Sequence, residues 1–196
     1  MAITRILFVC TGNTCRSPMA EGLCRMMAKR EGLSLEVRSA GVTAHDGAPV
    51  SRHSEEILHK KGAGEGMGTS RYLRKEEIRW ADLILTMTMF HKQQVIASHP
   101  EAVEKVYTLK EYTMDDPFRL GVLEERAALQ SELELKKSLG QPITTEERER
   151  LVRLHLAAPD FDIADPFGGS KRDYEETAHE IEEALARLIS RLKSGA

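Results

Sequence analysis

Residues 5–18 read RILFVCTGNTCRSP, and this stretch decides how the chain begins to fold. The first six residues, Arg5–Cys10, form an apolar run rich in strand-forming side chains, and Thr11-Gly12-Asn13 follows as a turn signal. After Ser17-Pro18, apolar residues recur at three- and four-residue spacings as far as Gly32. This pattern predicts a helix that Ser17 caps and whose first turn holds Pro18. The stretch therefore predicts a strand, a loop and a helix, in that order.

The chain then alternates between short apolar segments and amphipathic ones. We expect three further strands, at Leu33–Val42, Asp82–Met87 and Lys105–Leu109. We expect three further helices in this alternation, at residues 51–60, 89–97 and 174–192. Strands that alternate with helices predict an α/β fold, here a three-layer α/β/α sandwich around a central parallel sheet of about four strands.

The segment from about 113 to 160 does not follow this alternation. It contains no clear strand, and two highly charged helical patterns, near residues 121–139 and 144–156, are separated by Gly140-Gln141-Pro142. Thr144 and Glu147 have the spacing of a capping box for the second helix. Because the segment is too short and too polar to hold a core of its own, we interpret it as a helical hairpin inserted into a single domain of residues 1–196.

The composition limits the class of protein. A length of 196 residues suits one domain, and 41% apolar residues are enough for a sizeable core. A net charge of -3 argues against bulk binding to nucleic acid or membranes. The sequence has neither a secretory signal pattern nor an apolar run near the roughly 18–20 residues of a membrane span. We expect a cytoplasmic monomer that binds neither nucleic acid nor membrane.

The three cysteines, Cys10, Cys15 and Cys24, all lie within the first 24 residues. A secreted disulfide framework would use an even number spread along the chain, and the spacings also miss the CxxC pairs of a structural zinc site. The seven histidines show no metal-binding spacing either. Reactive thiols or small buried side chains remain as explanations, and we expect neither a metal nor a cofactor.

The turn between the first strand and helix has the features of an oxyanion-binding loop. Cys10 ends the strand and Arg16 opens the helix, so the intervening backbone N–H groups turn toward a common centre ahead of a helix N-terminus. Arg16 supplies a two-pronged donor for phosphoryl oxygens, and the positive surroundings stabilise a thiolate at Cys10. Gly12 relieves crowding, and Ser17 can donate a hydrogen bond to the sulfur. A structural cysteine beside a surface arginine is the alternative.

The stretch from Val9 to Glu21, VCTGNTCRSPMAE, resembles the signature of the low-molecular-weight protein tyrosine phosphatases, and more narrowly that of their bacterial protein-arginine-phosphatase branch. Further similar stretches are Val37–Val42, Ala81–Met87, Thr108–Tyr112 and Asp165–Ser170. The resemblance implies a metal-independent hydrolase that acts on phosphorylated proteins through a phosphocysteine at Cys10. The residues expected to bind the substrate are Thr11, Gly12, Asn13, Thr14, Cys15, Ser17 and Phe167.

Phosphoryl transfer to Cys10 requires a leaving group that departs protonated, so a carboxylic acid should lie near the loop. Two sequences compete, Asp116-Pro117-Phe118 and Asp165-Pro166-Phe167. Only the second continues as Gly-Gly-Ser into the final helix, as the family pattern does. We therefore favour Asp165 over Asp116 as the general acid, with Asp162 as a less favoured neighbour.

The resemblance also suggests the substrate. The tyrosine phosphatases of this family carry a bulky aliphatic residue where this chain has Thr14, whereas the arginine-phosphatase branch carries threonine. A threonine hydroxyl can meet a guanidinium N–H, while Asp165 pairs with the same group and Phe167 flanks its plane. We expect phosphoarginine in proteins as the substrate and a protein arginine kinase as the opposing enzyme. Phosphotyrosine is the alternative.

Other interpretations remain. Arsenate reduction on the same scaffold would need a further cysteine downstream of Cys24, and the sequence has none. A non-catalytic phosphoprotein-binding or scaffolding module is the alternative of a different class. Cys15 is either a partner for Cys10 in a protective disulfide or a small residue that packs the loop.

Overall fold

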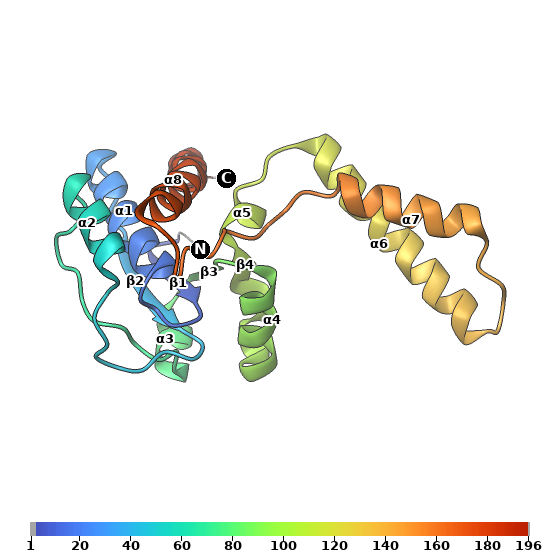
Figure 1. Cartoon of the computed structure of the whole chain (residues 1–196), viewed down its shortest axis with the longest axis horizontal. Helices are drawn as coiled ribbons and strands as arrows, with labels where there is room; N and C mark the ends of the chain where they lie inside the picture. Colours follow the sequence, from blue (N-terminus) through green and yellow to red (C-terminus); the bar gives the residue numbers. More distant parts are fainter. Residues whose placement is uncertain (1–2, 196) are drawn as a thin grey trace. The chain divides into compact units, whose positions relative to one another are not determined.

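The computed structural model describes residues 3–195 and contains one four-stranded sheet (Figure 1). Its strands are β1 (Arg5–Cys10), β2 (Glu36–Gly41), β3 (Leu83–Thr86) and β4 (Val106–Thr108). All pairings are parallel and the order is β2-β1-β3-β4, so β1 lies inside the sheet between β2 and β3. The expected α/β fold with a four-stranded parallel sheet is confirmed. Parallel strands end at the same edge of a sheet, so the loops that follow β1, β2 and β3 meet there.

Helices cover both faces of this sheet. They are α1 (Arg16–Arg30), α2 (Arg52–Lys60), α3 (Lys75–Trp80), α4 (Met89–Ser98), α5 (Leu109–Tyr112) and α8 (Lys171–Ser194), with a 3-10 turn at Pro100–Lys105. Side chains of β1 alternate between the two faces, because successive residues of a strand point in opposite directions. Phe8 belongs to one buried cluster, and Leu7 and Val9 belong to the other.

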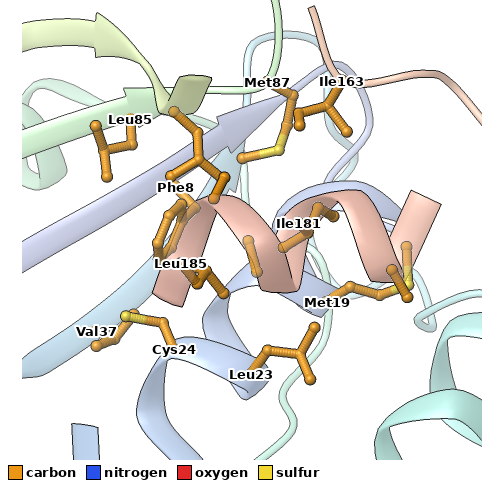
Figure 2. Close-up of a cluster of buried hydrophobic side chains, with 14 of the residues drawn as sticks. Phe8, Met19, Leu23, Cys24, Val37, Leu85, Met87, Ile163, Ile181 and Leu185 are labelled. Atoms are coloured by element: carbon orange, nitrogen blue, oxygen red, sulfur yellow. The ribbon is translucent and has the colours of Figure 1, made fainter. Parts of the chain in front are cut away.

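The larger cluster joins the sheet to α1 and α8 (Figure 2). Phe8 of β1, Met19 and Leu23 of α1, and Ile181 and Leu185 of α8 are completely buried there. Such contacts fix the start of α1 against the end of β1, because close-packed interiors leave little room for either element to shift. Burial of this cluster therefore holds the intervening loop from both ends.

Cys24 belongs to the same cluster and is fully buried. Burial raises the pKa of its thiol to about 12, because the charged form would lose its hydration. Cys24 therefore remains a protonated, apolar core residue.

The beginning of α1 differs from the sequence expectation. The helix begins at Arg16, its N-cap is Cys15, and no side chain caps it. The expectation that Ser17 caps the helix is wrong, because its hydroxyl lies 3.0 Å from Cys10 Sγ and donates to the carbonyl of Ala40 at 3.4 Å. A residue expected to close a helix end instead contacts the neighbouring strands.

The described residues divide into two compact units. The sheet and its covering helices form the first, and Met114–Asp160 forms the second. The second unit holds α6 (Pro117–Ser138) and α7 (Thr145–Ala157), which pack against each other. The interpretation of this unit as an insertion into a single domain stays a prediction.

The predicted capping box of the second helix is present in α7. Thr144 accepts a hydrogen bond from the N–H of Glu147, and the Glu147 carboxylate accepts one from the N–H of Thr144. Glu147 also pairs with Lys136 of α6. Hydrogen bonds from Lys136 and Thr144 lower the pKa of Glu147 to about 2. One carboxylate thus caps α7 and links it to α6.

Candidate active site

The loop between β1 and α1, residues 11–15, closes around the sulfur of Cys10. The Cys10 side chain is 3% exposed and lies at the end of the central strand. The N–H of Asn13 donates to Cys10 Sγ at 3.3 Å, and the hydroxyl of Ser17 lies 3.0 Å from the same atom. One backbone N–H of the loop and one hydroxyl from the first turn of α1 therefore contact the sulfur.

Asn13 holds the shape of this loop. Its backbone is in the left-handed region, with φ of 53°, which asparagine tolerates better than most residues. Its side-chain amide donates to Ser17 Oγ at 2.9 Å and to Ser39 Oγ at 2.8 Å, and its carbonyl oxygen accepts from the N–H of Arg71 at 2.8 Å. These three bonds connect the loop to α1, to β2 and to the segment before α3, and they fix the backbone N–H groups in place.

Arg16 and Asp165 form an ion pair beside the loop. Arg16 is 4% exposed; its Nη2 donates to Asp165 Oδ2 at 2.7 Å and its Nη1 to the carbonyl of Ile163 at 3.2 Å. The Asp165 side chain is about half exposed, and its other oxygen accepts from the N–H of Phe167 at 3.2 Å. A carboxyl group therefore lies at the edge of the loop, in contact with the arginine that opens α1 and accessible to a bound molecule.

The three candidate acids differ in what they contact. Asp116 is the N-cap of α6 and accepts from the N–H groups of Phe118 and Arg119. Asp162 accepts from the N–H of Met89 at 2.7 Å, at the start of α4. Asp165 pairs with Arg16 at 2.7 Å. The structure therefore brings Asp165 to Arg16, whereas Asp116 and Asp162 accept hydrogen bonds at the starts of helices.

The remaining loop residues occupy different environments. Thr14 is half-buried, and its Oγ1 lies 3.6 Å from Cys15 Sγ. Cys15 is buried, with its sulfur 3.3 Å from the hydroxyl of Tyr174, and it is a free thiol, as is Cys10. Burial is the largest cause of a raised pKa for Tyr174, followed by its bond to Cys15. Phe167 is 77% exposed at the tip of its turn.

Several contributors to this site were not predicted from the sequence. Ser39, at the end of β2, accepts from Asn13 and donates to Glu21 at 2.6 Å. A Cβ at Gly41 would lie 2.5 Å from the carbonyl oxygen of Thr11, so only glycine fits where β2 meets the loop. His91 contacts Thr11 from α4. Spacing along the chain gives no signal for such contacts, because each is made by a residue from a different element.

Among residues 3–195, no group of three or more histidine, cysteine, aspartate or glutamate side chains is arranged to hold a metal ion. The same part of the chain contains no helix that is both long and apolar enough to cross a membrane.

Residues 5–126 match the model of a known family, described as low molecular weight phosphotyrosine protein phosphatase. The matched residues are well over half of the chain and include the whole Cys10-to-Arg16 loop. The chain belongs to this family. This match confirms the resemblance to the family that the short motifs indicated.

Individual relatives extend the similarity past the matched region. A protein-arginine-phosphatase of Bacillus subtilis (strain 168) is 36% identical over 188 residues, covering 96% of each chain. One of Geobacillus stearothermophilus is 34% identical over 190 residues, covering 97% of each. A solved structure of YwlE arginine phosphatase, a mutant with a phosphorylated active-site serine, is 34% identical with a TM-score of 0.71, over 97% of this chain and 96% of the other.

Proposed function

We propose that this protein is a cysteine-dependent phosphatase that hydrolyses phosphoarginine in proteins. The observation that carries the phosphatase proposal is the contact of Asp165 with Arg16 at 2.7 Å beside the Cys10 loop, which brings a nucleophile, an anion-binding arginine and an acid together. Support for phosphoarginine comes from Thr14 in the loop and from near full-length similarity to two protein-arginine-phosphatases.

In the proposed reaction, Cys10 Sγ attacks phosphorus in line with the leaving nitrogen. The phosphoryl oxygens bind the loop N–H groups and Arg16, which stabilise the charge that they carry in the transition state. Asp165 gives its proton to the leaving nitrogen as the P–N bond breaks and the S–P bond forms. Asp165 then takes a proton from water as that water attacks phosphorus, the S–P bond breaks and inorganic phosphate leaves.

The ion pair between Arg16 and Asp165 fits the order of these steps. Without a bound anion, the Arg16 guanidinium donates to Asp165. A phosphoryl group is the stronger partner for the same donors, because it carries about two negative charges and offers the planar fork two oxygens, whereas Asp165 offers one. Its binding would therefore free the Asp165 carboxyl group to face the leaving atom.

The preference for phosphoarginine rests on Thr14, whose side chain is half-buried in the loop. A hydroxyl there accepts from a guanidinium N–H, whereas a bulky aliphatic side chain would leave that donor without a partner. Phe167, which is exposed, offers a ring face to the planar guanidinium. A phenyl ring would gain nothing from the Thr14 hydroxyl, so phosphotyrosine is the poorer substrate.

The direct test compares kcat/KM on peptides that carry phosphoarginine, phosphotyrosine or phosphoserine. We expect phosphoarginine to be preferred, and we expect Thr14→Ile to shift the preference toward phosphotyrosine by about tenfold or more, the value of one buried hydrogen bond. Thr14→Ser, which keeps the hydroxyl, is the matched control. An unchanged preference in Thr14→Ile would contradict the proposed role of Thr14.

The nucleophile is tested by Cys10→Ser. We expect turnover to fall below detection, because a serine hydroxyl lacks the thiolate's nucleophilicity at neutral pH, while binding of inorganic phosphate remains measurable. Intact-protein mass spectrometry after incubation with substrate should find at most one phosphoryl group on the variant. Activity comparable to that of the unaltered protein would exclude Cys10 as the nucleophile.

The proposal extends to the substrates of the enzyme, its opposing enzyme, its oligomeric state and its location in the cell. Its substrates would be phosphorylated proteins, its functional counterpart a protein arginine kinase, and it would act as a monomer in the cytoplasm. Phosphoarginine levels in cells that lack or overproduce the protein would test the pairing with such a kinase.

A further inference from the structure

One buried side chain at the loop has no part in the reaction described above. His91, in the first turn of α4, is 3% exposed and is held at both ring nitrogens. Its Nε2 lies 2.8 Å from Thr11 Oγ1, and its Nδ1 lies 2.9 Å from Thr88 Oγ1. Thr11 directly follows Cys10, so His91 connects the phosphate-binding loop to the N-terminus of α4.

The charge state of His91 follows from its surroundings. Burial, and then the positive charge of Arg16, lower its pKa to about 4, and this outweighs the opposite effects of Asp165 and Asp162. The imidazole is therefore neutral at physiological pH, with one nitrogen that donates and one that accepts. The hydrogen-bond network decides which nitrogen carries the proton.

Thr88 settles this choice. Its hydroxyl oxygen already accepts from the backbone N–H of His91 at 3.2 Å, as the N-cap of α4. Within residues 3–195, His91 Nδ1, 2.9 Å away, is the one contacting atom that can accept the hydroxyl's own proton. Each tautomer leaves one hydroxyl proton without a partner in the described part of the chain, and donation by Thr88 to Nδ1 leaves it on the exposed Thr11 rather than on the half-buried Thr88, which costs less because water can reach it. The His91 proton is then on Nε2, which donates to Thr11 Oγ1.

This direction has a consequence for Thr11. Because Nε2 donates to it, the Thr11 hydroxyl cannot donate to the ring, and its own proton points elsewhere. Thr11 is exposed, and its hydroxyl has no second hydrogen-bond partner in the described part of the chain. Its backbone is fixed independently, since its carbonyl accepts from the N–H of Thr43 at 3.0 Å. The hydrogen bonds from Thr88 to His91 and from His91 to Thr11 therefore leave the Thr11 hydroxyl free to donate, one residue after the nucleophile in sequence.

We propose that His91 is a positioning residue that fixes the Thr11 hydroxyl as a hydrogen-bond donor to a phosphoryl oxygen of the bound substrate. This inference rests on the proposed phosphatase function, but it does not depend on which phosphorylated residue the enzyme prefers. It adds a side-chain donor to the backbone N–H groups and Arg16, and it accounts for a buried, neutral histidine at this place.

The test uses two substitutions at His91 that separate its two bonds. The amide nitrogen of His91→Gln reaches the position of Nε2 and can still donate to Thr11, whereas that of His91→Asn reaches only the position of Nδ1. Thr11→Val removes the hydroxyl at nearly constant volume, and Thr11→Ser keeps it. Each variant is assayed for kcat and KM on para-nitrophenyl phosphate, for the dissociation constant of inorganic phosphate, and for its melting temperature.

We expect His91→Asn and Thr11→Val each to weaken phosphate binding and to lower kcat/KM by about tenfold, the value of one hydrogen bond to a charged acceptor. His91→Gln and Thr11→Ser should stay within about threefold of the unaltered protein. The double variant His91→Asn with Thr11→Val should lose no more than Thr11→Val alone, because both changes remove the same bond.

Three results would overturn the proposal: additive losses in the double variant, equal losses in His91→Gln and His91→Asn, or a loss that follows the melting temperature and leaves phosphate affinity unchanged. If the unaltered protein hydrolyses no phosphate compound, the proposed function fails. The phosphate dissociation constants then still decide whether His91 acts through Thr11.

Discussion

The protein contains the tripeptide Asp-Pro-Phe twice, and the two copies share one local hydrogen bond but have different surroundings. Asp116 Oδ1 accepts from the N–H two residues ahead at 3.1 Å, and Asp165 Oδ1 does the same at 3.2 Å. Phe118 is 79% exposed and Phe167 is 77% exposed. The second oxygen of Asp116 pairs at 3.4 Å with Arg119 of its own helix, whereas that of Asp165 reaches Arg16. The tripeptide thus accounts for the shared hydrogen bond, and the residues beyond it determine what the other carboxylate oxygen contacts.

The residues that follow explain this difference. After Asp116 the chain continues directly into α6, so the carboxylate becomes the helix N-cap and accepts from a second N–H, that of Arg119. After Asp165 the chain passes through Gly168, with φ of 76°, and α8 begins only at Lys171, with Ser170 as its cap. The glycine turn thus separates Asp165 from the helix, which leaves its second oxygen for a distant partner.

The largest expected effect comes from removing the acid in each copy. Asp165→Asn should lower kcat by about a hundredfold or more, because general acid catalysis contributes that much, whereas Asp116→Asn should stay within about twofold. Initial rates on a phosphoarginine peptide measure both. Since the two substitutions are chemically identical, a greater loss in Asp116→Asn would show that the wrong copy was assigned.

A smaller effect is expected from the two exposed phenylalanines. Phe167→Ala should raise KM for a phosphoarginine peptide by about fivefold, the value of one cation–π contact at a partly exposed site, with little change in kcat. Phe118→Ala removes an equally exposed ring and is the control, with KM unchanged. Equal KM values in both variants would remove Phe167 from the substrate site.

The smallest effect concerns stability. Asp116→Ala removes the acceptor of two backbone N–H groups and should destabilise the start of α6 by about 1 kcal/mol, seen as faster amide hydrogen exchange at residues 117–120. Asp116→Asn keeps a good N-cap and should exchange as the unaltered protein does. Unchanged exchange in Asp116→Ala would mean that the cap contributes nothing.

The sequence predicted the long elements better than the short ones. The apolar run of β1 and the three- and four-residue spacing of apolar residues in α1 predicted both elements. The position of the loop between them was predicted as a result. Helix α3 has six residues and α5 has four, too few to show a helical repeat, and neither was predicted. Of the segment Leu33–Val42, expected as the second strand, only Glu36–Gly41 pair with β1, because pairing depends on the partner strand.

The residues of the site also differ in whether the sequence predicted them. Cys10, Arg16 and Asp165 belong to motifs that are continuous in sequence, and the structure brings these three together. Ser39 and His91 reach the loop from β2 and α4, and neither was predicted as a site residue, although Ser39 lies in the family-like stretch Val37–Val42. Contacts of this kind depend on tertiary packing, so they can be predicted only once the strand order is known.

The position of Cys10 at the end of β1 also determines how the enzyme should lose activity on heating. β1 is paired on both edges and buried on both faces, so its backbone amides should exchange with solvent only through global unfolding. Asp165 and Phe167 lie in an exposed turn outside the sheet, and we expect this turn to open without unfolding of the sheet. The nucleophile thus belongs to the most protected cooperative unit of the protein, and the acid to one of the least protected. Reversible loss of turnover below the melting temperature should therefore begin at the acid, while the anion-binding loop remains intact.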